Sequence, residues 1–149
     1  MRKSHVTAYT DGACLGNPGP GGWACILIYG PHRKELWGAE PHTTNQRMEL
    51  RAAVEALSAL KRPCRVRLHS DSAYLVNAFV QGWVKRWQQN GWRTQAKEEV
   101  ANRDLWERLI ELTQVHDVEW AKVKGHGDDE LNNRCDELAR AAAQRIQEA

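Results

Sequence analysis

The chain has 149 residues, a formal net charge of +2 and a hydrophobic share of 42%. A chain of this length buries roughly 70% of its unfolded surface, so neither disulfides nor a structural metal is needed for stability. The composition shows no break, which predicts one domain spanning residues 1–149. The slight basicity alone indicates no particular partner.

The cysteines and the N-terminus indicate a compartment. No C-x-x-C pair and no zinc-spaced cluster occurs among Cys14, Cys25, Cys64 and Cys135, which predicts free thiols in a reducing environment. The N-terminal residues turn polar before the apolar core of a signal peptide can form, and no window reaches the ~18 apolar residues of a membrane span. We therefore expect a soluble, cytoplasmic protein with no membrane partner.

The first third of the chain has the pattern of a three-stranded meander. Residues 5–11 alternate in polarity, residues 21–30 are almost continuously apolar, and residues 33–40 follow the turn GPH. Three such segments in succession favour antiparallel pairing. The connection DGACLGNPGPGGW has neither G-x-x-x-x-G-K-[ST] nor a G-x-G-x-x-G before a helix, so we interpret it as a tight turn and not as a phosphate cradle.

Helices and strands alternate in the remainder. A helix is expected from an N-cap at Thr44 to Leu60, because Pro63 bars extension. There follow a strand from 64 to Asp71, a helix at 73–81 capped by Asp71 or Ser72, a tryptophan-rich segment at 83–97, a helix at 102–114, a strand at 117–125, a polar turn at 126–133 and a helix at 134–146. This order predicts an α/β fold with a mixed five-stranded sheet, its later strands parallel, and helices on both faces.

Two aspartates stand at strand ends. Asp11 closes the first strand and Asp71 closes the fourth, and each precedes a turn or a helix. Ligand sites of α/β sheets collect at such strand ends. If the two strands are neighbours, we expect both carboxylates to point into one site.

Glu49 is expected on the inner face of its helix, because at 100° per residue it lies within about 40° of Ala53, Ala56 and Leu60. A carboxylate directed toward the sheet needs a partner. That partner is either an arginine or a cation shared with Asp11 and Asp71.

Asp136 is a fourth candidate. We expect it in the first turn of the last helix, where the helix dipole alone would favour an acid. Taken with the other three, it completes an oxygen-donor set without cysteine or histidine, which suits Mg2+ or Mn2+ better than zinc. Two such ions about 3.5–4 Å apart would stabilise the attacking and leaving oxygens of a phosphodiester cleavage.

Aromatic and basic residues alternate between Trp83 and Lys97, a pattern that offers stacking and phosphate contacts together. The alternative is that Trp83 and Trp87, spaced i and i+4, pack a short helix onto the body. Trp92, beside Gly91 and Arg93, is expected outside the core.

Several stretches in order resemble one family over nearly the whole chain. They are YTDGACLGNPGPGGW, TTNQRMEL, SDSAYLVNAF, GWRT, DLWERL and VKGHGDDELNNRCDELA. The sequence resembles ribonuclease H of the bacterial type 1 form. The resemblance implies the ribonuclease H-like fold with strand order 3-2-1-4-5.

The resemblance also implies an activity. It is the endonucleolytic hydrolysis of the RNA strand of RNA/DNA hybrids with two Mg2+ ions, or with Mn2+ as a substitute, leaving 3′-hydroxyl and 5′-phosphate ends. Sequence preference would be small, and replication primers would be among the substrates. The family's metal-binding carboxylates match Asp11, Glu49, Asp71 and Asp136. Its loop histidine, which assists proton transfer or product release, matches His126, although alone this residue reads as an ordinary loop histidine.

Hybrid-binding positions carry over as well. The positions around the site match Cys14, Asn17, Thr44, Asn45 and Gln46, and the glycines of the first connection would let the nucleic-acid backbone approach closely. The family's basic protrusion, which grips the DNA strand, matches the segment containing Trp83, Lys85, Arg86, Trp87 and Trp92. Some relatives carry lysines where this chain has Gln88 and Gln89, so hybrid affinity through the protrusion would either be lower or shift to Lys85 and Arg86.

Two other functions fit the same fold. An integrase-like enzyme that cuts DNA would be expected to bring a DNA-binding domain or a different acidic triad, and neither is visible. A non-catalytic nucleic-acid-binding module would have lost its metal ligands, but all four carboxylates are intact. We further expect a monomer with no obligate protein partner.

Overall fold

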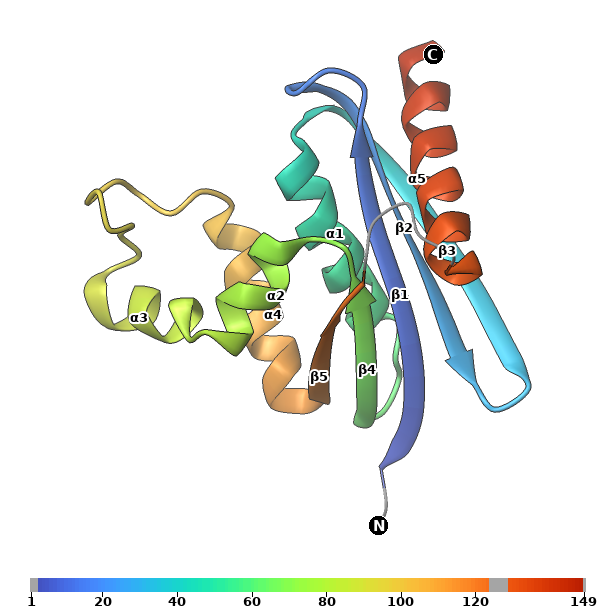
Figure 1. Cartoon of the computed structure of the whole chain (residues 1–149), viewed down its shortest axis with the longest axis horizontal. Helices are drawn as coiled ribbons and strands as arrows, with labels where there is room; N and C mark the ends of the chain where they lie inside the picture. The colour runs from blue at the N-terminus through green and yellow to red at the C-terminus, as the bar shows by residue number, and fades with distance from the viewer. Residues whose placement is uncertain (1–2, 124–128, 149) are drawn as a thin grey trace.

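The computed structural model describes residues 3–123 and 129–148, which form five strands and five helices. In chain order these are β1 (Ser4–Cys14), β2 (Gly19–Tyr29), β3 (His32–Thr43), α1 (Asn45–Ser58), β4 (Cys64–Ser70), α2 (Ala73–Val80), α3 (Trp83–Asn90), α4 (Arg103–Val115), β5 (Asp117–Lys122) and α5 (Glu130–Glu148). In Figure 1 the sheet stands between α5 on one side and a protrusion carrying α3 on the other.

The strands form one sheet in the order β3-β2-β1-β4-β5, as predicted. β1, β2 and β3 pair antiparallel, whereas β4 pairs parallel to β1 and to β5. The parallel pairs require crossovers, and α1 and the α2–α4 segment supply them. The expected mixed sheet is therefore confirmed.

Helices cover both faces of this sheet. A Cβ added to Gly21 would meet Met48 of α1, and one added to Gly22 would meet the Ala139 carbonyl of α5. Successive strand residues point to opposite faces, so α1 and α5 lie on opposite sides of β2. The same observation revises the expected role of the glycines: Gly12, Gly21 and Gly22 let helices, rather than a nucleic-acid backbone, approach the strands closely.

Helix starts follow the predicted caps. The Thr44 hydroxyl accepts from the Arg47 amide at 3.2 Å, and the Ser72 hydroxyl accepts from the Leu75 amide at 3.2 Å. α1 ends at Ser58, two residues earlier than expected. The connection between β1 and β2 is a tight turn of only residues 15–18, where Gly16 has a φ of 81°.

The tryptophans belong largely to the core. Trp87 and Trp92 are each 8% exposed, and the rings of Trp87 and Trp106 meet edge-on at 5.2 Å between centroids. The expectation that Trp92 lies outside the core is wrong. Its amide donates to the Trp87 carbonyl at 2.7 Å and its carbonyl accepts from the Val100 amide at 3.0 Å, so the backbone after α3 folds back and turns the ring inward.

The last helix starts earlier than its sequence pattern predicts. α5 begins at Glu130, within the expected polar turn, and the Asp129 carboxylate accepts from the amides of Leu131 and Asn132 as a cap. Asp136 therefore lies in the second turn and not in the first, so the helix dipole does not explain it. Within the described ranges, no helix is long and apolar enough to cross a membrane.

Candidate active site

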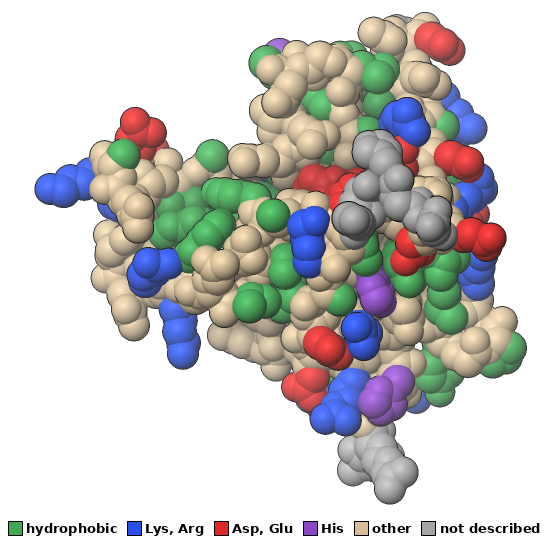
Figure 2. Space-filling model, in the orientation of Figure 1, with side chains coloured by type: hydrophobic (Ala, Val, Ile, Leu, Met, Phe, Trp, Pro, Cys, Tyr) green, Lys and Arg blue, Asp and Glu red, His purple; other side chains and the backbone are tan. Residues whose placement is uncertain are grey.

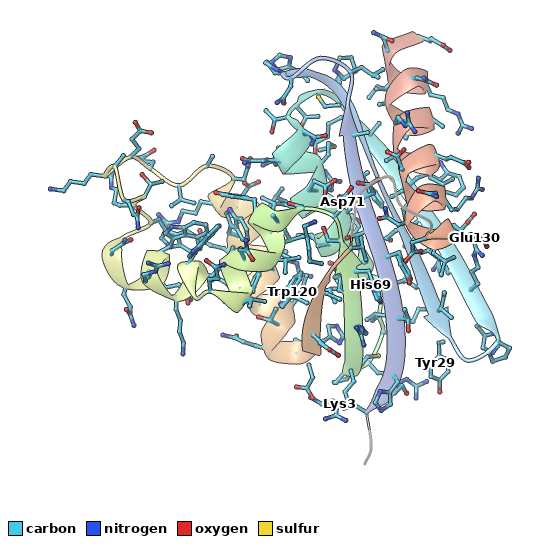
Figure 3. All side chains as sticks on the ribbon, in the orientation of Figure 1. Lys3, Tyr29, His69, Asp71, Trp120 and Glu130 are labelled. Carbon is cyan, nitrogen blue, oxygen red and sulfur yellow. The ribbon has the colours of Figure 1, made fainter. Side chains whose placement is uncertain are left out.

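The parallel pairing of β1 and β4 aligns two aspartates. The register pairs Ser4 with Cys64 and Tyr9 with His69, so Asp11 and Asp71 occupy matching positions two residues further on. β4 ends at Ser70, and Asp71 lies just beyond that end (Figure 3). The prediction that these two side chains share one site follows from this alignment.

Glu49 reaches the same site because α1 sits unusually close to β1. A Cβ at position 12 would lie 2.5 Å from the Glu49 amide, so a glycine is needed for this approach. The Gly12 amide donates to Glu49 Oε1 at 2.6 Å and to Asp11 Oδ1 at 2.9 Å. Gly12, which the sequence analysis did not single out, thus holds two of the carboxylates; its place directly after Asp11 was the available signal.

Three carboxylates converge closely enough to share a cation. One oxygen each from Asp11, Glu49 and Asp71 lies within 4.8 Å of the others. Asp136 lines the same pocket of about 380 Å³ but stands outside that close group. Acidic side chains accordingly gather near the centre of the face shown in Figure 2.

The site carries uncompensated negative charge. Burial raises the pKa of Asp11 to about 7, and the charges of Asp71 and Asp136 add to the effect. Burial, followed by the contact with Asp11, raises the pKa of Glu49 well above its ordinary range. Glu49 is 5% exposed, and its Oε2 has no hydrogen-bond partner among the described residues. This set of oxygen donors fits a hard divalent cation.

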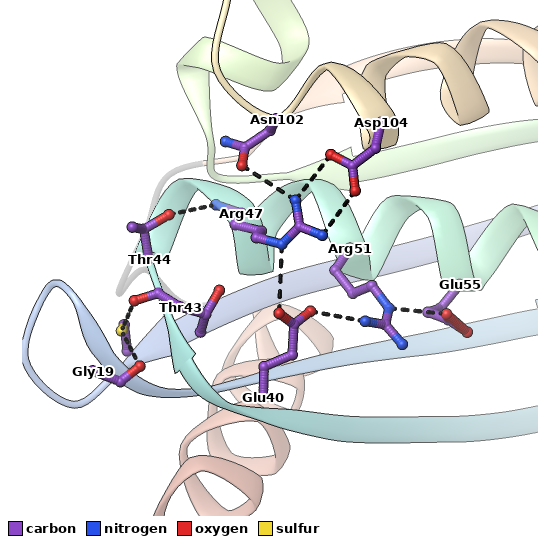
Figure 4. A network of polar contacts seen from close by, with 10 residues as sticks. Gly19, Glu40, Thr43, Thr44, Arg47, Arg51, Glu55, Asn102 and Asp104 are labelled. Atoms are coloured by element: carbon purple, nitrogen blue, oxygen red, sulfur yellow. Dashed lines mark hydrogen bonds and ion pairs between the residues drawn. The ribbon is translucent and has the colours of Figure 1, made fainter.

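The alternative partner for Glu49, an arginine, is excluded for the nearest candidates. Arg47 and Arg51 flank Glu49 on α1, but both bond other acidic residues (Figure 4). Arg47 forms a two-pronged contact with Asp104 at 3.0 and 2.9 Å, and Arg51 bonds Glu40 at 2.8 Å and Glu55 at 3.0 Å. This network ties α1 to β3 and α4, and among residues 3–123 and 129–148 no basic side chain bonds the Glu49 carboxylate.

The predicted hybrid-binding residues surround the pocket. Cys14, Asn45 and Gln46 line it together with the carboxylates. The Asn17 side chain accepts from the Asn45 amide at 3.0 Å and so joins the β1–β2 turn to the start of α1. Thr44 is used as the cap of α1, and the Cys14 thiol bonds the carbonyls of Gly19 and Thr43.

The protrusion carries basic side chains next to aromatic side chains. Lys85 and Arg86 are exposed on α3, Trp83 is half-buried, and Trp87 lies beneath them. A pocket of about 420 Å³ opens there, with Trp83 and Arg86 in its lining. Figure 2 shows hydrophobic side chains on this part of the surface with basic ones at its margin. His126, the remaining predicted site residue, lies outside the described residues.

Comparison with known proteins agrees with this geometry. The family model RNase H matches residues 3–144. A ribonuclease H of Moorella thermoacetica is 68% identical over 92% of this chain and 90% of its own, and one of Symbiobacterium thermophilum is 65% identical over 92% and 93%. One of Chlorobaculum parvum is 62% identical over 95% and 97%.

Solved structures show the same fold. LC9-RNase H1, described as a type 1 RNase H with the type 2 active-site motif, superposes with a TM-score of 0.88 at 33% identity, over 98% of this chain and 75% of that one. LC11-RNase H1 superposes with a TM-score of 0.74 at 22% identity, over 95% of this chain and 99% of that one.

Fold and site together define an α/β enzyme with a carboxylate pocket suited to a divalent cation. The match over nearly the whole chain is more specific: the chain belongs to the ribonuclease H family and is an endoribonuclease.

Proposed function

We propose that this endoribonuclease hydrolyses the RNA strand of RNA/DNA hybrids in a metal-dependent reaction. The observation that carries the proposal is the convergence of Asp11, Glu49 and Asp71 within 4.8 Å, in a chain up to 68% identical to proteins named ribonuclease H. The related LC11-RNase H1 was solved in complex with an RNA/DNA hybrid. The products would carry 5′-phosphate and 3′-hydroxyl ends.

The four carboxylates would hold two Mg2+ ions, or Mn2+ in their place. Asp11, Glu49 and Asp71 offer oxygens to a shared cation, and Asp136 faces the same pocket from α5. Such a pair of ions stabilises both the attacking and the leaving oxygen of a phosphodiester. The Oε2 of Glu49, which has no hydrogen-bond partner among the described residues, and the raised pKa of Asp11 support this fit, because a bound cation would stabilise the ionised form of both carboxylates.

The residues around the pocket would position the hybrid. Asn17, Asn45 and Gln46 are exposed beside the carboxylates, and Cys14 and Thr44 are half-buried behind them. They would contact the backbone and the minor-groove edge of the hybrid. Recognition of 2′-hydroxyls and duplex shape, without base-specific contacts, accounts for choice of the RNA strand with little sequence preference. His126 would assist proton transfer or product release.

The protrusion would bind the DNA strand. Lys85 and Arg86 offer phosphate contacts, and the half-buried Trp83 is the aromatic ring nearest to that role. Trp87 and Trp92 support this surface from below, because both are buried.

At the level of the cell, we propose one catalytic domain over residues 1–149 that acts in the cytoplasm as a monomer without an obligate partner. Replication primers and other RNA hybrids would be its substrates. No feature of the described residues favours another substrate. The integrase-like function and the non-catalytic binding function are therefore treated as possible outcomes of the following cleavage test.

The test is cleavage of end-labelled RNA/DNA, RNA/RNA and DNA/DNA duplexes by the wild type and by Asp11→Asn in Mg2+. We expect cleavage of RNA in the first duplex only, and a loss of at least about 100-fold in the variant, because it removes a charged ligand of the cation. Cleavage of DNA/DNA would favour the integrase-like function. Binding of the hybrid without cleavage would favour the non-catalytic module.

A further inference from the structure

Arg140 is the one basic residue that hydrogen-bonds any of the four site carboxylates within the described parts of the chain. It lies one turn after Asp136 on α5, and its guanidinium donates to Asp136 Oδ2. Asp11 and Glu49 are instead bonded to the Gly12 amide. Arg140 was not among the residues predicted from the sequence, although its i,i+4 spacing from Asp136 was a usable signal.

This contact differs from an ordinary surface ion pair. The Asp136 side chain is 20% exposed and faces the pocket, and its charge reaches Asp11, whose pKa it helps to raise. The Arg140 side chain is 56% exposed and has no second acidic partner within the described residues. Asp136 thus has one oxygen bonded to Arg140 while it lies beside a cluster with excess negative charge.

We infer that Arg140 is a positioning residue that serves as a built-in counterion of Asp136 and competes with the divalent cation for it. This rests on the proposed metal site. Without the cation, the guanidinium neutralises Asp136 and fixes its rotamer. A cation held by Asp136 would have to displace the guanidinium from that carboxylate. Arg140 would therefore weaken cation binding at Asp136 and keep exchange of the ion easy.

Calorimetric titration of Mn2+ into the nucleic-acid-free protein tests this inference without an activity measurement. The dissociation constant to be compared is that of the Mn2+-binding step that Asp136→Asn weakens. Arg140→Gln should lower the dissociation constant of that step about 3- to 10-fold, because it frees the partly exposed Asp136 carboxylate from the guanidinium that competes for it. Arg140→Lys should change it less than about 2-fold, since the charge remains.

Two controls separate competition at Asp136 from a general charge effect. Arg108→Gln removes an equally exposed arginine from an ion pair on α4, with Glu111, and should leave the Mn2+ affinity unchanged. In an Asp136→Asn background, Arg140→Gln should shift the affinity less than about 2-fold, because the shared carboxylate is gone.

Three results would overturn the inference. They are an unchanged or weaker Mn2+ affinity in Arg140→Gln, an equal tightening in the Asp136→Asn background, and a binding step insensitive to Asp136→Asn. In each case the duplex-cleavage assay is read independently, so the proposed function can stand while the role of Arg140 falls. An absence of any Mn2+ binding would overturn the proposed metal site together with the inference.

Discussion

Glu49 and Asp11 are neighbouring buried carboxylates, and their surroundings affect the stability of the protein. Both are almost fully buried, and both are held by one backbone amide, that of Gly12. In the absence of a cation, ionising them together is costly, because a low-dielectric site disfavours two neighbouring negative charges. The features that suit the site to a cation therefore destabilise the metal-free fold.

The first prediction concerns Asp11→Asn in the metal-free protein. The pKa of Asp11 is raised from 3.8 to about 7, so the folded state binds the proton more tightly than the unfolded state does. Wild-type stability from this group is therefore greatest below pH 3.8, declines as pH rises, and reaches its minimum above about 7. At pH 8 in a chelator, Asp11→Asn should raise the free energy of unfolding by roughly 1–3 kcal/mol.

Urea unfolding at pH 4 and pH 8 measures this effect. The gain in the free energy of unfolding that Asp11→Asn brings should shrink toward pH 4, where the wild-type Asp11 carboxyl is protonated in the folded state. Addition of Mg2+ at pH 8 should stabilise the wild type more than the variant. An Asp11→Asn variant no more stable than the wild type at pH 8 would show that the surroundings of Asp11 do not disfavour its ionised form.

Residues differ in how well the sequence predicts their roles. Asp71 was predictable because a strand end is visible as a change of pattern, and Thr44 because a cap has a chemical signature. The expectation that Asp11 closes the first strand is wrong, because β1 continues to Cys14 and Asp11 pairs with Ala24 inside the ladder. Trp92 was not, because its burial depends on a loop that folds back onto Trp87, which no local pattern encodes. A substitution of Trp92 would consequently disturb the packing of the core, so it is not a clean test of contact with the hybrid.

At the scale of elements, the site depends on two close helix–strand contacts. α1 approaches β1 over Gly12, which brings Glu49 to the site, and α5 approaches β2 over Gly22, which brings Asp136 to it. The sequence predicted these helices but not their separation from the sheet. The start of α5 was also misplaced, because the cap is Asp129, inside a run of polar residues that resembled a turn.

The second prediction tests the α5 contact through Gly22→Ala. The added Cβ would collide with the Ala139 carbonyl, which is backbone and cannot turn aside. We expect a loss of about 2–3 kcal/mol in the free energy of unfolding, as for overpacked cores. Gly30→Ala is the matched control, since position 30 has a φ of 55° and open space around it.

That control should lose only about 1 kcal/mol from backbone strain. Denaturant unfolding of both variants provides the comparison. A loss in Gly22→Ala no larger than in Gly30→Ala would mean that α5 can move away from the sheet without cost.

At the scale of the whole molecule, we expect the acidic pocket and the basic protrusion to bind different strands of the hybrid. The pocket lies at the strand ends, whereas α3 extends to one side of the body (Figure 1). A hybrid that spans both would place its RNA strand at the carboxylates and its DNA strand over α3. The family and the strand order were predictable from motifs distributed along the chain, because each motif marks a different element of the same sheet.

The third prediction concerns the protrusion. Lys85→Ala with Arg86→Ala should weaken hybrid binding and reduce the slope of log affinity against log salt by about 1–2, because fewer counterions are released. Lys61→Ala with Arg62→Ala is the matched control, an adjacent exposed basic pair after α1, and should leave the slope unchanged. Binding measured from 50 to 200 mM salt distinguishes the pairs, and an equal slope in all three proteins would contradict a role for α3.

The most direct test of the metal-dependent site is a crystal of the wild-type protein bound to a hybrid with non-cleavable RNA linkages, soaked in Mn2+ and measured for anomalous scattering. We predict density among Asp11, Glu49, Asp71 and Asp136, as two peaks about 3.5–4 Å apart. Anomalous density that avoids these four carboxylates, or its absence from the pocket at saturating Mn2+, would contradict the proposed cation site.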